Sequence, residues 1–238
     1  MAIPAKTAHA SEPPRAADQL GYNDGMLRGT RLQVFEWTGL QEFMAPADGI
    51  TDPMTTVYDR PLDRLTLPPD ADSNAGESFE SLTAPDRFRN GDVVIVCQDE
   101  NTVMGYVWLS FKDFWVSESR LFLAIADKEA LVYDTFIFPQ YRGRPIRAQR
   151  ASMALGGRRR EGRDYPVIFR LAIKIRSVGL ARGCVRVITY AESHNTNSWK
   201  TQLHLGAKLT MSVYSIHFFD RFSLHWATGR PFASRFHR

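Results

Sequence analysis

Cysteine is scarce in this sequence. The 238 residues include only two, Cys97 and Cys184, and neither belongs to a C-x-x-C pair or to a Cys/His pattern with the spacing of metal ligands. This argues against a disulfide framework and against a structural zinc site. Both cysteines lie within apolar runs, so we expect them in the core and we expect no bound metal.

Long apolar runs are also missing. No stretch approaches the roughly 20 consecutive apolar residues that cross a bilayer. Residues 1–19, MAIPAKTAHASEPPRAADQ, lack the apolar segment of a secretory signal. We therefore expect a cytoplasmic protein that does not bind membranes. The apolar content of 44% is still enough to build a buried core, so the sequence predicts a globular protein.

Acidic residues are nearly absent from one segment. Between Arg142 and Arg163 there are eight arginines and one acid, Glu161, so this segment holds much of the positive charge behind the net +4. Such a segment favours phosphate groups, whether of a nucleotide cofactor, a lipid or nucleic acid, although a solvated loop is an equal alternative. The segment contains no aromatic residue, which argues against a surface for single-stranded nucleic acid.

The remaining sequence alternates between strand and helix patterns. Residues 1–25 lack an apolar period and are expected to form a mobile tail. Residues 26–238 are expected to form one domain, with an Arg-rich insertion at 144–160 and with short helices and long loops in 39–90. The predicted strands are 32–37, 93–97, 103–111, 130–138, 185–190, 208–219 and 222–226. The predicted helices are 166–182, capped by Gly183, and 195–205. This order predicts an α/β domain with a mixed sheet.

Two motifs lie at the ends of consecutive predicted strands. The first is Tyr133-Asp134-Thr135-Phe136-Ile137-Phe138-Pro139-Gln140-Tyr141-Arg142-Gly143, and the second is Asn195-Thr196-Asn197-Ser198 followed by Gly206-Ala207. In this order they resemble two motifs of the GCN5-related N-acetyltransferase (GNAT) family, and the resemblance covers the chain from Gly91 to Trp226. It implies a central mixed sheet flanked by helices, with splayed fourth and fifth strands. The implied activity is transfer of an acyl group from acyl-CoA to an amine.

The resemblance also implies where the coenzyme binds. In the family, the pantetheine arm pairs with backbone groups of the fourth strand, here Phe136, Ile137 and Phe138. In the second motif, Asn195 and Ser198 would contact the coenzyme. The same two residues also form a good helix N-cap, which is an equally strong interpretation.

Two alternative loop frames are open for the coenzyme pyrophosphate, which in the family lies on N–H groups at a helix start. A frame that begins at Arg142 and Gly143 places Pro145, which has no N–H, at a donor position. We therefore favour a frame that uses Arg159, Gly162 and Arg163. Spare arginines near this frame would suit the 3′-phosphate of the coenzyme.

Acyl transfer to an amine needs a base, donors for an oxyanion and an acid for the leaving thiolate. Asp134 on the fourth strand and Glu192 after the fifth are the candidate bases. Each also has a plainer interpretation, Asp134 as the partner of an arginine and Glu192 as a solvated carboxylate. Many relatives use a tyrosine as the acid, but the equivalent position here is Gln202. Tyr190 is the preferred substitute, and the histidines at 194 and 204 are alternatives.

The expected co-substrate is acetyl-CoA or another acyl-CoA, and the expected acceptor is a small-molecule or peptidyl amine. A homodimer is a candidate oligomeric state. A different class of function is also open, in which an inactive GNAT-fold module binds a polyanion such as nucleic acid through its Arg-rich loop. The absent tyrosine and the altered loop favour the binding module, whereas the two retained motifs favour the enzyme.

Overall fold

The computed structural model describes residues 28–40, 54–62, 65–68, 82–143, 145–146, 165–218, 222–229 and 236–237. The strands are β1 (Arg28–Thr38), β2 (Thr55–Tyr58), β3 (Val93–Asp99), β4 (Thr102–Ser110), β5 (Phe114–Val116), β6 (Leu121–Leu123), β7 (Glu129–Ile137), β8 (Pro145–Ile146), β9 (Tyr165–Pro166), β10 (Arg186–Glu192), β11 (Lys208–Phe218), β12 (Phe222–Gly229) and β13 (Phe236–His237). The helices are α3 (Pro85–Arg89), η1 (Pro139–Tyr141), α4 (Val167–Ala181) and α5 (Thr196–His204).

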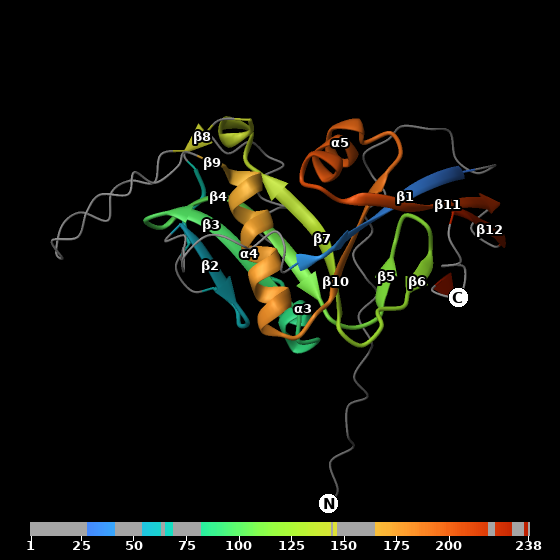
Figure 1. Cartoon of the computed structure of the whole chain (residues 1–238), viewed down its shortest axis with the longest axis horizontal. Helices are drawn as coiled ribbons and strands as arrows, with labels where there is room; N and C mark the ends of the chain where they lie inside the picture. Colours follow the sequence, from blue (N-terminus) through green and yellow to red (C-terminus); the bar gives the residue numbers. More distant parts are fainter. Residues whose placement is uncertain are drawn as a thin grey trace, which may run out of the picture.

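One mixed sheet organises the molecule (Figure 1). Its eight strands lie in the order β12-β11-β1-β10-β7-β4-β3-β2. Every neighbouring pair is antiparallel except β7 and β10, which are parallel and are connected through α4. The predicted α/β class, the predicted strands of the sheet and the two predicted helices are therefore confirmed. Gly183 has the positive φ of 75° expected of a residue just after a helix end.

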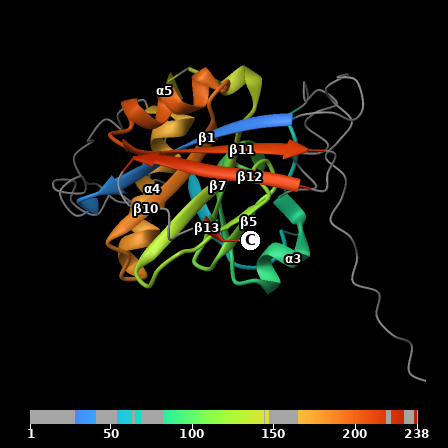
Figure 2. The ribbon, with the colours of Figure 1, turned by 90° about the vertical axis from the view of Figure 1, so that its right-hand side faces the viewer.

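The first strand, β1, pairs with two strands that are distant from it in the sequence. β1 is inserted between β10 and β11, where it pairs antiparallel with both. Figure 2 looks onto β1, β11 and β12, which cross the front of the molecule side by side. The alternation of residues 32–37 predicted this strand, but a local pattern holds no information about which strands it joins.

Each face of the sheet has its own apolar core. On one face, α4 packs across β3, β4 and β7 (Figure 1), and its buried residues include Val167, Leu171 and Ile175. The opposite face is covered by the β5–β6 hairpin and by Phe88 of α3, which contact a cluster that includes Trp108. Both cysteines are buried, as expected. No helix in the described ranges is long and apolar enough to cross a bilayer.

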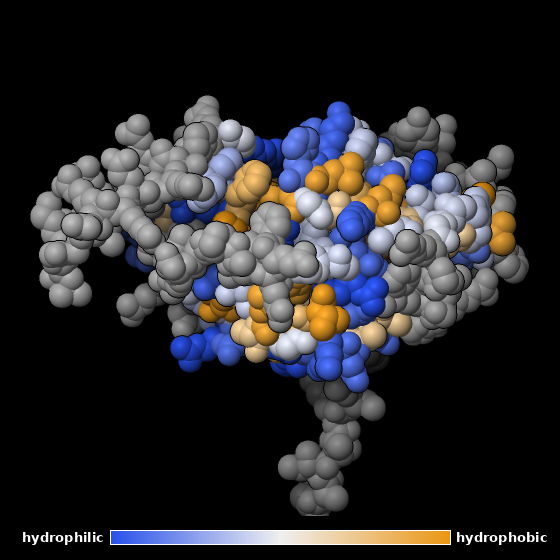
Figure 3. Space-filling view, viewed as in Figure 1, coloured by the Kyte–Doolittle hydropathy of each residue, from blue (hydrophilic) through white to orange (hydrophobic). Residues whose placement is uncertain are grey.

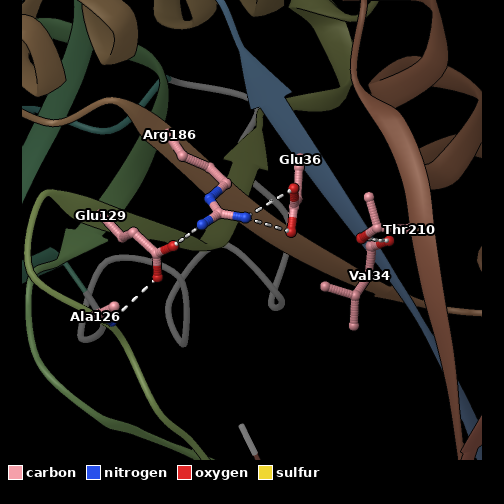
Figure 4. Close-up of polar contacts among 6 residues, drawn as sticks. All are labelled: Val34, Glu36, Ala126, Glu129, Arg186 and Thr210. Atoms are coloured by element: carbon pink, nitrogen blue, oxygen red, sulfur yellow. Dashed lines mark hydrogen bonds and ion pairs between the residues drawn. The ribbon is translucent and has the colours of Figure 1, made fainter. Parts of the chain in front are cut away.

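A charged network ties three strands together at the end where β7 and β10 begin (Figure 4). Arg186 of β10 lies between two buried carboxylates, Glu36 of β1 and Glu129 of β7. Its Nη2 lies 2.6 Å from Glu129 Oε1, and its Nη1 lies 3.3 Å from Glu36 Oε2. Glu129 also accepts a hydrogen bond from the backbone N–H of Ala126 at 3.0 Å. The network holds β10 against both of its neighbours at this end of the sheet.

Candidate active site

The two parallel strands separate at the opposite end of the sheet. The ladder between β7 and β10 runs only from Glu129 and Arg186 to Val132 and Thr189. Beyond this point β7 continues beside β4, and β10 continues beside β1. The predicted splay of the fourth and fifth strands of the family pattern, here β7 and β10, is therefore present. It gives β7 an edge that has no partner strand among the described residues.

Only part of the predicted pantetheine track faces this free edge. The N–H of Phe138 donates to Met104 O at 3.1 Å, so Phe138 is bonded toward β4. Backbone groups of consecutive strand residues point to opposite edges, so Phe136 also points toward β4 and Ile137 points toward β10. The carbonyl of Ile137 accepts from Arg142 Nε at 2.8 Å, whereas its N–H lies on the free edge. Of the three residues, Ile137 is thus the one whose backbone faces the splay.

The side chain of Arg142 folds back over the end of β7. Besides its bond to Ile137 O, its guanidinium lies 5.7 Å from the centre of the Phe136 ring. Gly143 follows with a φ of 65°, in the left-handed region that favours glycine. Arg159, Gly162 and Arg163, which form the preferred pyrophosphate frame, lie outside the described residues, so that assignment stays a prediction.

A β-bulge lies at the point where the strands separate. Trp108 of β4 pairs with Tyr133, but Tyr106 pairs with Phe136, so one residue of β4 opposes two residues of β7, Asp134 and Thr135. Asp134 has a φ of 46°, and Asp and Asn tolerate this region better than most side chains. Bulges re-aim side chains next to a change in pairing. Here the bulge leaves both Asp134 and Thr135 exposed at the splay.

Asp134 is held by an arginine that the sequence analysis did not single out. Arg87 of α3 lies 2.5 Å from Asp134 Oδ2 through Nη1. Its guanidinium also lies over the rings of Trp108 and Tyr133, at 5.1 Å and 5.2 Å from their centres. The plainer interpretation of Asp134, as the partner of an arginine, is confirmed. The side chains of Arg87 and Asp134 are 29% and 33% exposed, and their contact restricts where this carboxylate can point.

Tyr190 lies on β10 just beyond the last residue that pairs with β7. Burial raises the pKa of its phenol well above the ordinary value of 10, and the carboxylates of Glu118, Asp134 and Glu192 raise it further, while Arg87 lowers it. Tyr190 is thus within electrostatic reach of the other two predicted catalytic residues, Asp134 and Glu192. The phenol keeps its proton at neutral pH and can act there as a hydrogen-bond donor.

Glu118 is a member of this group that the sequence analysis missed. It lies in the turn between β5 and β6, where its backbone carbonyl accepts from Thr30 Oγ1 at 3.0 Å. The two strands of this hairpin have only three residues each, too few to show an apolar alternation. The only sequence feature that pointed to this hairpin was the aromatic pair Phe114 and Trp115 just before the turn.

Glu192 ends β10 and pairs with the following turn. Its Oε2 lies 2.9 Å from His194 Nε2, and its side chain is 25% exposed, against 77% for the histidine. Both residues line a cavity of about 570 Å³. Glu192 is therefore more shielded than the solvated carboxylate that was the plainer alternative.

The second sequence motif forms the start of α5. The N–H of Ser198 donates to Asn195 Oδ1 at 3.1 Å, so Asn195 is the N-cap of this helix. The capping interpretation of this pair is confirmed, and a coenzyme contact remains a prediction. Among the described residues, no group of three or more His, Cys, Asp or Glu is placed to hold a metal ion.

We expect the buried Tyr133 and the partly buried Tyr190 to make the fold sensitive to alkaline pH. Burial raises the pKa of Tyr133 as well, and a hydrogen bond of 2.7 Å to Asp92 Oδ2 adds to this effect. Above pH 10 the unfolded chain releases the phenol protons while the folded chain keeps them, so stability falls as pH rises. Each tyrosine adds up to about 1.4 kcal/mol per pH unit to this loss. Urea unfolding between pH 8 and 11 should show a shallower loss for Tyr190→Phe than for the wild type, and parallel curves would contradict this assignment.

Comparison with known proteins gives matches in structure alone. No family model matches the sequence, and no curated protein matches it. Solved structures with a similar chain include a protein described as a GNAT-family acetyltransferase from Novosphingobium aromaticivorans, with 12% identity, a TM-score of 0.42, and coverage of 79% of this chain and 63% of that one. A GCN5-related N-acetyltransferase from Sphaerobacter thermophilus has 12% identity and a TM-score of 0.40, over 86% of this chain and 53% of that one.

An aminoglycoside N-acetyltransferase in complex with CoA is similar at 14% identity and a TM-score of 0.35, over 57% of this chain and 87% of that one. All of these TM-scores lie below 0.5, so the likeness is a loose one. The chain's own strand order, with a parallel pair that splays beside a bulge, is consistent with the GNAT fold.

Proposed function

We propose that this protein is an acyl-CoA-dependent N-acyltransferase that transfers an acetyl group to a primary amine by direct attack on the thioester. The observation that carries the proposal is the splay between β7 and β10, with the bulge at Asp134 on one side and Tyr190 and Glu192 on the other. A free strand edge next to a bulge offers backbone donors to a ligand. Carboxylates and a protonated phenol nearby supply groups for proton transfer and hydrogen bonding.

The free edge of β7 fits the amide-rich pantetheine arm of an acyl-CoA. The N–H of Ile137 would pair with an amide of the arm, and Phe136 and Phe138 would support it by packing. Arg142 and Gly143 follow directly and are candidates for the phosphates, together with Arg159, Gly162 and Arg163. Asn195 and Ser198 would contact the coenzyme from the start of α5.

The chemistry needs one bond to form and one to break. The amine nitrogen attacks the thioester carbonyl carbon, the C–N bond forms, and the C–S bond breaks to release coenzyme A thiolate. A backbone N–H at the Asp134–Thr135 bulge would donate to the carbonyl oxygen as its negative charge develops. Asp134 or Glu192 would accept the proton that the amine loses, directly or through a water. Tyr190 would donate a hydrogen bond to the leaving sulfur.

Direct calorimetric titration with acetyl-CoA tests the proposal. We expect binding of one coenzyme per chain, because the splay and the bulge are formed without a ligand. The chain should then acetylate at least one amine in a panel of small-molecule and peptidyl acceptors. If folded protein binds no coenzyme, the proposal fails. Binding of a nucleic-acid oligomer in the same assay would then support the polyanion-binding module.

Asp134→Asn should lower turnover far more than coenzyme affinity. If this carboxylate is the base, removing it should reduce kcat by about 10²- to 10⁴-fold. The coenzyme dissociation constant should change less than about threefold, because the pantetheine edge is separate from the Asp134 side chain. The measurements are steady-state kinetics with the best acceptor of the panel and calorimetry. The matched control is Asp86→Asn on α3, whose carboxylate pairs with Arg89 at the surface. Equal turnover of the Asp134 variant and the wild type would leave Glu192 as the base.

A further inference from the structure

The β5–β6 hairpin lies over the splay on the face of the sheet opposite α4. Its strand β5 contributes Phe114, whose ring centre lies 4.3 Å from that of Tyr133 on β7 and 6.5 Å from that of Tyr190 on β10. Its turn is attached to β1, where the hydroxyl of Thr30 donates to the backbone carbonyl of Glu118 at 3.0 Å. The hairpin therefore spans β7, β10 and β1, and it holds the backbone of Glu118 above this face.

The strand register places the polar groups under the hairpin on one face. Tyr190 and Glu192 are two residues apart on β10, and their partners on β1 are Val34 and Leu32, which belong to the apolar core of this face. Thr30 continues the same spacing along β1, and side chains two apart on a strand share a face. On this face Thr30 and Glu192 also line the cavity of about 570 Å³. Open space therefore adjoins the groups at the splay.

Glu118 is the carboxylate of this group that has no cation beside it. Asp134 is paired with Arg87, and Glu192 is paired with His194. The side chain of Glu118 is partly buried and accepts a hydrogen bond at 3.1 Å from the hydroxyl of the preceding serine. No basic side chain in the described part of the chain pairs with it. A ligand cation at this position would meet an unopposed negative charge.

The phenol of Tyr190 connects this charge to the proposed reaction. Its ring is partly exposed, and its hydroxyl makes no hydrogen bond to any described residue. Burial is the main cause of the raised pKa of this phenol, and Glu118 is the strongest of the three carboxylates that add to it. Figure 3 shows apolar residues on the visible face in separate patches between hydrophilic ones, which favours a small charged ligand over a broad apolar partner.

We propose that Glu118 selects acceptors with a second ammonium group, so that the acceptor of the acetyl group is a diamine. One amine would attack the thioester at the splay, between Asp134 and Tyr190. The other would pair with Glu118 and keep its proton throughout. A charge-assisted contact of this kind is stronger than one between neutral groups, whereas a carboxylate in place of the second amine would be repelled. This assignment of the acceptor rests on the proposed function.

The test compares acceptors that differ only at the end remote from the reacting amine. Putrescine and cadaverine are assayed with saturating acetyl-CoA against butylamine and pentylamine, and γ-aminobutyrate carries the opposite charge. At least one diamine should exceed its monoamine in kcat/KM by about 10- to 100-fold, and γ-aminobutyrate should be the poorest acceptor. A chain that binds acetyl-CoA but acetylates neither diamine faster than its monoamine overturns this inference alone. Failure of acetyl-CoA to bind overturns the proposed function and this inference with it.

Substitutions of Glu118 isolate its charge. Glu118→Gln keeps the backbone carbonyl that accepts from Thr30, so Tm should be unchanged. It should lower the ratio of kcat/KM for the better diamine to that for its monoamine by about tenfold or more, mainly through KM, because the contact is remote from the reacting bond. Glu118→Lys should lower this ratio further. The matched control is Glu100→Gln in the exposed turn between β3 and β4, which should leave the ratio unchanged. A wild-type ratio in folded Glu118→Gln protein would contradict the proposal.

Discussion

Arg186→Met is expected to cost the fold about 3 kcal/mol of stability, the lower end of the range for breaking a buried ion pair. The expected loss comes from the two buried carboxylates that remain after the substitution. Glu36 and Glu129 are 6% and 3% exposed, so two carboxylates would stay buried without the cation that lies between them. The lower end applies because the side chain of Arg186 is itself 29% exposed and water can replace part of its contacts. Urea unfolding at pH 7 measures the loss.

A matched surface variant and a combined variant complete this experiment. Arg89→Met removes an arginine whose partner, Asp86, is equally exposed, so its effect should stay within about 0.5 kcal/mol. Adding Glu36→Gln and Glu129→Gln to Arg186→Met should restore part of the lost stability, because uncharged amides are less costly to bury. A loss of less than about 1 kcal/mol for Arg186→Met alone would show that water reaches both carboxylates.

Gly105→Ala should weaken both the fold and coenzyme binding. Gly105 lies on β4 opposite Ile137, and an added Cβ would lie 2.8 Å from Phe136 O and 3.0 Å from a methyl group of Val167. Either β7 or the start of α4 must therefore move, at a cost of about 1–3 kcal/mol. Because Phe136 and Ile137 belong to the proposed pantetheine track, we expect acetyl-CoA to bind at least tenfold more weakly.

The control is a second glycine in a buried position. A Cβ at Gly179, inside α4, would meet its nearest atom at 3.5 Å, an ordinary contact. Gly179→Ala should therefore stabilise the fold by about 0.5–1 kcal/mol through helix propensity and leave coenzyme affinity unchanged. Thermal unfolding of both variants measures the change in stability, and calorimetry measures the change in affinity for acetyl-CoA. Wild-type affinity in a folded Gly105→Ala protein would remove the end of β7 from the proposed coenzyme site.

The part of the fold that the sequence predicts well is the unit from β7 through α4 to β10. Its strands are rich in apolar, β-branched and aromatic residues, and α4 repeats apolar residues at helical spacing up to Gly183, so each element is encoded locally. The β5–β6 hairpin was missed because its strands are too short to show a period. The place of β1 was missed for a different reason, since strand neighbours in a sheet depend on contacts between distant segments.

The residues of the candidate site also divide into those that a sequence motif predicts and those that only the tertiary structure reveals. Motif resemblance led to Asp134, Tyr190 and Glu192, and in the structure both carboxylates act on the pKa of Tyr190. Arg87 and Glu118 escaped notice because each reaches the site from a segment with no motif. Arg87, for example, is 47 residues from Asp134. The bulge also escaped notice, because an aspartate with positive φ looks in sequence like any other strand residue.

The insertion of β1 between β10 and β11 also governs how the chain can fold. The contacts of β1 in Figure 4 join residues 150 positions apart, from Glu36 to Arg186, and 176 positions apart, from Val34 to Thr210. During synthesis, an apolar strand therefore emerges long before either of its partners exists. Pairing between distant segments slows folding and lengthens the time for which the apolar strand β1 is exposed and prone to aggregation. The pairings of β1 with β10 and β11 can thus form only after these later segments have been made.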